Sequence, residues 1–256
     1  MFEERKAQIT AAFDAYTAAY DISDVKIRLK YDHTYHVADN CVAIARSLSL
    51  PEDGIHLAWT IGMLHDIGRF EQIRRYGTFL DSISVNHAEF GADLLFHGGL
   101  IHSFDVPEKD CALIEKAIRC HNRYLLPDEL DDSEALFCRI IRDADKVDIF
   151  RVNIETGMEA IYNVPEAVLK KESISPAVKN AFMAMQTIDR SLMETTIDHL
   201  ASHLALAFGL EYPESRSIAL RQGYLERLIA FESENQDTID FLKQAAEILH
   251  EFLNVH

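Results

Sequence analysis

The segment that most constrains the fold is an apolar run that ends in a charged pair. Residues Ile55 to Leu64 contain few polar side chains and are typical of a buried helix. His65 and Asp66 follow directly, and Gly68 can end the helix just beyond them. An ionised carboxylate in apolar surroundings is costly unless a cation or hydrogen bonds compensate. Because His and Asp together are natural ligands for a divalent metal, other segments are expected to supply further ligands.

Composition and patterning favour a mainly helical protein. The 256 residues include only ten Gly and six Pro, and 48% of them are hydrophobic, which is ample for a sizeable core. Ala, Leu, Ile and Glu are frequent, and no sustained two-residue alternation indicates strands. No linker separates independent domains. We therefore predict a single all-α domain over residues 1–256.

The charge balance limits the classes of partner. A formal net charge of −17 argues against a long nucleic acid or an anionic membrane, because both bind extended Lys and Arg surfaces. A small phosphorylated substrate stays compatible, since bound divalent ions make a pocket locally positive. No signal-like segment opens the chain, and no stretch approaches the roughly 20 apolar residues that span a bilayer. A cytoplasmic protein is expected.

Five successive segments with helical patterning carry candidate ligands near a helix end or on a buried face. Asp32 is a suitable N-cap for a helix over residues 33–49. Asn86 and Glu89 have the spacing of a capping box, which predicts a helix that starts between them. A helix over residues 134–151 is apolar on most sides. In chain order, the candidates are His36, His65, Asp66, His87, His121 and Asp145.

On these residues the sequence resembles the HD superfamily of metal-dependent phosphohydrolases, which is named for its His-Asp doublet. The resemblance covers roughly residues 30–155. It implies an HD-domain helical bundle with its metal-binding core at about 30–155. A helical C-terminal extension over about 156–256 would then pack on this core.

The resemblance also implies a first metal site. In the family, the first His, the doublet and a late Asp bind one metal. The late Asp usually stands in an Ala-Asp-basic context, which here selects the Asp in Asp-Ala-Asp-Lys over its neighbours. The matching residues are His36, His65, Asp66 and Asp145.

Binuclear members of the family add two histidines, which His87 and His121 resemble, and Asp66 then bridges the metals. The implied cofactors are one or two divalent ions per chain, among Fe, Mn, Zn, Co, Ni and Mg. The chain lacks the Gly-Tyr-Pro motif of the cyclic-dinucleotide branch, since Asn122 and Arg123 follow His121. Hydrolysis of cyclic di-GMP is therefore not expected.

Asp66, Arg69 and Lys146 form the predicted catalytic set. Metals held by His and Asp lower the pKa of a shared water and polarise a phosphoryl oxygen. The forked guanidinium of Arg69 suits a substrate phosphate, and an ion pair with Glu71 is the alternative. Lys146, next to a predicted ligand, either contacts substrate or points to solvent.

Three functions stay open. The leading one is a phosphatase or phosphodiesterase that hydrolyses a small phosphate ester or anhydride, such as a nucleotide or related metabolite. Some binuclear members of the superfamily are diiron oxygenases with a similar four-His, two-Asp set, which is the second. The third is a regulatory module that keeps the metal without turnover.

Other histidines and the C-terminal helices have simpler explanations than a metal or ligand site. His102 lies between two candidate ligands in the sequence, and His199 and His203 have the i, i+4 spacing of a metal pair. An exposed helix face explains that pair better. Three amphipathic helices, expected over 176–208, 215–231 and 235–253, supply core or the surface of a homo-oligomer.

Overall fold

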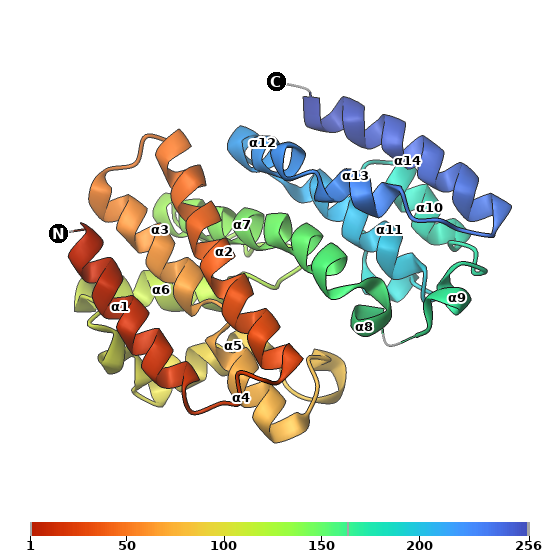
Figure 1. The fold of residues 1–256 in the computed structure, drawn as a ribbon. Coiled ribbons are helices and arrows are strands. Elements are labelled where there is room, and N and C mark those ends of the chain that lie inside the picture. Colours follow the sequence, from red (N-terminus) through yellow and green to blue (C-terminus); the bar gives the residue numbers. More distant parts are fainter. Residues whose placement is uncertain (1, 163, 255–256) are drawn as a thin grey trace. The chain divides into compact units, whose positions relative to one another are not determined.

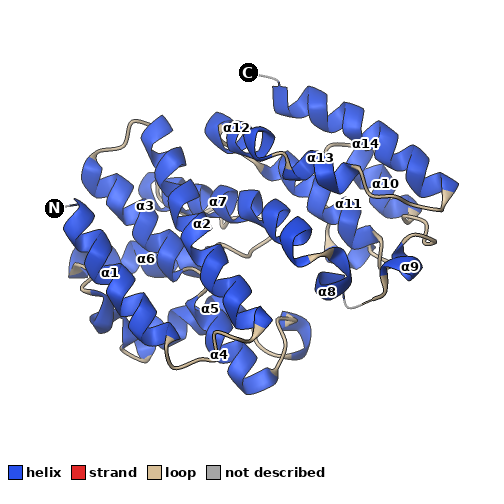
Figure 2. Ribbon diagram, viewed as in Figure 1, coloured by secondary structure: helices blue, strands red, loops and turns tan. Residues whose placement is uncertain are grey.

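The computed structural model describes residues 2–162 and 164–254, which form helices and connecting segments without a β-strand (Figure 2). The predicted all-α fold is thereby confirmed. The chain divides into two compact units, Met1–Ala144 and Asp145–His256. The division falls inside helix α7 (Asp132–Thr156), which belongs to both. That all of the chain is one domain stays a prediction.

The first unit begins with α1 (Phe2–Thr17), α2 (Val25–Ser47) and α3 (Glu52–Leu64), and α2 packs against α3 (Figure 1). The two helices approach closely where Gly62 meets Ala38. A Cβ atom on Gly62 would lie 2.6 Å from the Ala38 Cα, which no ordinary contact permits. This contact brings the end of α3, and the residues that follow it, against the buried face of α2.

The sequence predicts a helix that starts at residue 33, but helix α2 begins earlier, at Val25. Its N-cap is Asp24, whose side chain accepts a hydrogen bond from the backbone of the first turn. Asp32 lies inside the helix and accepts a hydrogen bond from Arg28 Nε at 2.8 Å. The mixed charges of this first stretch conceal the apolar periodicity on which the prediction relied.

Helix α4 (Ile67–Tyr76) starts almost directly after α3, so Gly68 does not end a helix as expected. Its lack of a side chain serves contact with α5 (His87–Ala92) instead. A Cβ atom on Gly68 would lie 2.7 Å from the backbone nitrogen of Gly91. Helices α4 and α5 therefore meet backbone to backbone at this point.

Replacement of Gly68 by Ala is expected to lower the free energy of unfolding by about 1–3 kcal/mol, because the added methyl group overpacks a contact between two backbones. Gly54→Ala is the matched control, since a Cβ atom there meets Leu50 Cβ at an ordinary 3.4 Å. Alanine also favours the helix, so this control should stabilise slightly. Urea unfolding of both variants measures the difference, and equal stabilities would contradict the prediction.

The rest of the first unit consists of short helices and α6. Gly77, with φ 68°, ends α4. Asn86 caps α5 by accepting from the backbone nitrogens of Ala88 and Glu89, as its spacing predicts. The remaining elements are η1 (Asp81–Ile83), η2 (Asp93–His97), η3 (Leu100–Phe104) and α6 (Glu108–Cys120).

The second unit is also helical, but the helix expected over 176–208 is interrupted. The buried Asp198 carboxylate accepts hydrogen bonds from the backbone of Ser175 and Thr195, which draws two separate segments to one helix start. No described helix has the length and apolar character needed to cross a membrane. The elements are α8 (Met158–Tyr162), α9 (Glu166–Leu169), α10 (Pro176–Met183), η4 (Arg190–Leu192), α11 (Asp198–Ala205), η5 (Leu206–Gly209), α12 (Pro213–Gln222), α13 (Tyr224–Ile229) and α14 (Gln236–Asn254).

Candidate metal centre

The Asp66 carboxylate, between α3 and α4, lies at the centre of a cluster of four imidazoles in the first unit. Its side chain is only 3% exposed. Oδ2 lies 3.6 Å from Nε2 of both His33 and His65. Oδ1 lies 3.5 Å from Nε2 of His87 and 3.7 Å from Nε2 of His121. Each carboxylate oxygen therefore faces one pair of histidines.

Hydrogen bonds on the opposite ring nitrogen orient two of these histidines. Nδ1 of His65 lies 2.7 Å from the carbonyl oxygen of Gly62, and Nδ1 of His121 lies 2.7 Å from that of Ile118. A carbonyl oxygen only accepts, so Nδ1 of each ring carries the proton. The lone pair of Nε2 then points toward Asp66, which is the arrangement that metal-ligating histidines use.

His87 is oriented by Asp81, a residue that the sequence analysis missed. Asp81 Oδ2 lies 2.6 Å from Nδ1 of His87, and Oδ1 accepts from Arg69 Nη1 at 2.9 Å. Burial alone raises the pKa of Asp81, but the hydrogen bond from His87 and the charge of Arg69 hold it well below its usual range. Asp81 thus contacts the ring nitrogen of His87 that faces away from Asp66. It lies in an irregular connection that carries no periodic signal.

Arg69 is held between the cluster and the connection that follows α4. Its Nη1 donates to Gln72 Oε1 and to the carbonyl oxygen of Phe79, both at 2.8 Å, besides Asp81. The Arg69 side chain is 13% exposed, and its Nε lies 3.7 Å from Asp66 Oδ1. The ion pair with Glu71 that the sequence allowed is not the one observed. Contact with a substrate phosphate stays a prediction.

The structure replaces His36 by His33 in the cluster. His36 is exposed on α2, whereas His33 is buried and its ring centroid lies 5.4 Å from that of His65. The buried face of α2 includes Val37 and Cys41, and His33 lies four residues before Val37 on the same line. This spacing was the sequence signal that could have selected His33. The family resemblance assigns this ligand to His36, which lies exposed beside the buried face.

His33→Ala is expected to weaken divalent-metal binding at least about tenfold. The substitution removes one of the two imidazoles beside Asp66 Oδ2, so the metal ion loses a ligand. His36→Ala on the same helix should leave the dissociation constant unchanged. Isothermal titration of both variants with Mn²⁺ or Zn²⁺ tests the choice. If His36→Ala binds the metal more weakly than His33→Ala does, then His36 is the ligand and the assignment of His33 is wrong.

Lys30 is a second residue of the cluster that the sequence analysis missed. Its Nζ donates a 2.7 Å hydrogen bond to Asp66 Oδ2, and its side chain is 15% exposed. Burial alone raises the pKa of Asp66, but the charge of Lys30, together with the histidines around the carboxylate, outweighs it and holds that pKa well below its usual range. Asp66 is therefore ionised at neutral pH.

Asp145 and Lys146 lie on α7, at the start of the second unit. Asp145 is half-buried. The Lys146 ammonium donates to the carbonyl oxygen of Gly209 at the end of η5, within the same unit. The ligand role of Asp145 and the substrate contact of Lys146 stay predictions.

The other histidines singled out by the sequence lie elsewhere. His102 is exposed on η3. His199 and His203 are half-buried and stack on the ring of Tyr162, with centroids 5.4 and 5.6 Å away, so the expected exposed face is wrong. Nδ1 of His203 lies 2.9 Å from the Tyr162 hydroxyl, and burial lowers the pKa of His203 to about 3. A neutral aromatic cluster accounts for the pair.

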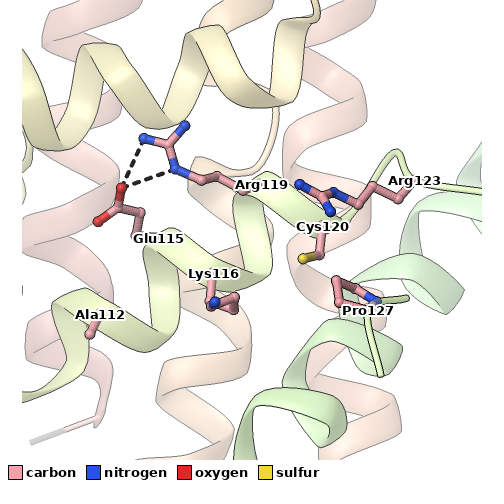
Figure 3. A pocket seen from close by; sticks show the side chains of 7 residues that line it. All are labelled: Ala112, Glu115, Lys116, Arg119, Cys120, Arg123 and Pro127. Carbon is pink, nitrogen blue, oxygen red and sulfur yellow. Dashed lines mark hydrogen bonds and ion pairs between the residues drawn. The ribbon is translucent and has the colours of Figure 1, made fainter. Parts of the chain in front are cut away.

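A hollow of about 360 Å³ lies along α6, outside the Asp66 cluster (Figure 3). Arg119, one of the cations in its lining, already pairs with three carboxylates, those of Glu89, Asp93 and Glu115. Arg123, a second cation of the lining, pairs with Glu89. It is lined by Ala112, Glu115, Lys116, Arg119, Cys120, Arg123 and Pro127.

The Asp66 cluster fits a divalent metal ion. Asp66 Oδ1 is buried and has no hydrogen-bond partner among the described residues, although nearby histidines surround it. One ligand atom from each of His65, Asp66 and His121 lies within 4.8 Å of the others, as do ring nitrogens of His33 and His65. Imidazole and carboxylate donors suit Zn, Fe, Mn, Co and Ni. The cluster could therefore hold a metal ion.

A family model matches the segment of the sequence that carries this cluster. Residues 31–149 match the family model described as HD domain. That segment includes Asp66, Asp81 and the four histidines around the carboxylate. No curated protein and no solved structure matches the chain.

Proposed function

We propose that this protein, whose residues 31–149 match the HD-domain family model, is a metal-dependent phosphohydrolase that cleaves a small phosphate ester or anhydride. A nucleotide or a related metabolite is the proposed substrate class. The observation that carries the proposal is the buried Asp66 carboxylate, each of whose oxygens faces a pair of histidines. Asp66 and these histidines would hold divalent ions, which would supply Lewis-acid catalysis of hydrolysis.

The proposed ligands fall into two groups around Asp66. His33 and His65 belong with Oδ2, and His87 and His121 belong with Oδ1. The sequence resemblance adds Asp145. When bound at such a site, divalent ions lower the pKa of water and polarise a phosphoryl oxygen.

The protein contributes orientation and charge to this chemistry. Gly62 and Ile118 fix the rings of His65 and His121 through their carbonyl oxygens. Asp81 fixes His87 in the same way and is itself held by Arg69. Because these partners are in place before any ligand binds, little reorganisation is needed during reaction. The guanidinium of Arg69 keeps a positive charge beside the site for the substrate.

Metal content and turnover of purified protein test the proposal. Protein prepared without chelators should contain about two divalent ions per chain. After reconstitution with Mn²⁺, Fe²⁺, Co²⁺, Ni²⁺ or Zn²⁺, it should hydrolyse an aryl phosphate or a member of a broad nucleotide panel. Metal-loaded protein that cleaves none of them would contradict phosphohydrolase activity and favour a regulatory module. Substrate-dependent oxygen uptake by iron-loaded protein would instead support a diiron oxygenase.

A further inference from the structure

The ammonium group of Lys30 shares the candidate metal centre. Its Nζ lies 2.7 Å from Asp66 Oδ2, and the same oxygen lies 3.6 Å from Nε2 of His33 and of His65. Among the described residues, Asp66 is the only hydrogen-bond acceptor for this ammonium. Lys30 therefore lies against the oxygen that the first metal ion would use.

One carboxylate oxygen does not serve a lysine and a divalent ion equally well. The ion carries twice the charge and gains two imidazole ligands as well, whereas Lys30 gains a single hydrogen bond. Two cations a few ångströms apart in a buried site also repel each other strongly. Binding of metal at Asp66 Oδ2 is thus expected to displace the ammonium.

The displaced ammonium has a short and defined reach. Lys30 lies within the continuous helix α2, and Thr34 Oγ1 donates to its carbonyl oxygen at 2.8 Å, so its backbone is fixed. The flexible side chain is 15% exposed, and Nζ lies 5.6 Å from the centre of the Phe79 ring. The ammonium can therefore turn away from Asp66 and stay beside the metal centre.

Lys30 is freer to meet a substrate than the other cation at this centre. Arg69 Nη1 already donates to three acceptors, so its guanidinium is committed to the connection after α4. An ammonium is a compact charge with three donors on a mobile stem, which suits a phosphate oxygen. A phosphate group next to bound metal would supply the acceptors that Lys30 loses.

We propose that Lys30 is a phosphate-binding residue that pairs with Asp66 in the metal-free protein and turns to the substrate phosphate when metal takes its place. The substrate part rests on the proposed function, and the competition with metal does not. Lys30 thus acts in two ways: it weakens metal binding and it strengthens phosphate binding.

Lys30→Met, which removes the charge and keeps the length, tests the competition. Titration of apo-protein with Mn²⁺ should give a dissociation constant about tenfold lower for one ion than in the wild type, because the competing charge-assisted hydrogen bond is gone. Lys26→Met is the control on the same helix, since Lys26 Nζ donates to the carbonyl oxygen of Gly77 and not to Asp66. It should leave the metal affinity unchanged.

Inorganic phosphate is the probe for the second part. On Mn²⁺-loaded protein, Lys30→Met should weaken phosphate binding about tenfold, and Lys30→Arg should restore most of the affinity because it keeps the charge. Thermal unfolding with and without metal separates folding defects from these effects. An unchanged metal affinity or an unchanged phosphate affinity in Lys30→Met overturns the proposal.

The outcome also separates this inference from the proposed function. A wild type that binds metal and shows the Lys30 effects, but hydrolyses no phosphate compound, contradicts only the proposed function. A wild type with phosphohydrolase activity whose Lys30→Met variant behaves like Lys26→Met contradicts only the role of Lys30.

Discussion

Replacement of Asp66 by Asn is expected to abolish binding of both metal ions and to lower phosphohydrolase turnover by about a thousandfold or more. The two oxygens of this carboxylate face both histidine pairs, so its loss affects both places at once. Lewis-acid stabilisation is worth several kcal/mol, and each 1.36 kcal/mol is a factor of ten in rate. Elemental analysis and steady-state kinetics measure the two effects.

The same substitution also removes the counter-ion of Lys30, and a charge left without a partner in a largely buried place destabilises a protein. The double variant Asp66→Asn, Lys30→Met restores the charge balance and should fold well while still lacking metal. Asp53→Asn is the surface control on α3, since the Asp53 side chain is exposed. Two ions per chain in the Asp66→Asn protein would show that this carboxylate is not a bridging ligand.

Asp81→Ala is expected to weaken metal binding by about 10–100-fold although Asp81 faces the back of a ligand. Carboxylates behind ligating histidines usually contribute this much, because they fix the ring and raise its basicity. Here Asp81 meets Nδ1 of His87 at 2.6 Å and holds Arg69 at the same time. One of the two ions should be lost first, because His87 faces Asp66 Oδ1 only.

Stepwise titration with Mn²⁺ reveals whether one ion or both are affected. Asp93→Ala is the matched control, because Asp93 is an exposed carboxylate that pairs with Arg119 away from the centre. Its metal affinity should equal that of the wild type. If Asp81→Ala weakens the binding of both ions equally and also lowers the unfolding temperature of the metal-free protein, Asp81 contributes to general stability and does not specifically orient His87.

The all-α fold and several site positions were predictable from sequence for physical reasons. The apolar run before His65 and Asp66 requires burial, so the doublet had to reach the interior with compensating partners. His87 follows a recognisable helix cap, and His121 follows the end of a helix. The structure places both beside Asp66. Their role as ligands stays a prediction.

Two of the missed residues, Lys30 and Asp81, depend on information that periodicity does not contain. His33 could have been chosen over His36 by its spacing to Val37 and Cys41, which places it on the buried face of α2. Lys30 appears in the sequence as one more solvated charge. Asp81 acts through the path of an irregular connection, which only the folded backbone defines.

The backbone contact between Gly68 and Gly91 has a consequence for metal selectivity. Gly68 is two residues after Asp66, and Gly91 is four residues after His87, so the contact fixes the helix that follows the carboxylate against the helix that carries one of its imidazoles. The separation between these donors is thereby set by main-chain atoms. Which ions the proposed centre accepts is then expected to depend on two positions that contribute no ligand atom, and a comparison limited to ligand identities would overlook them.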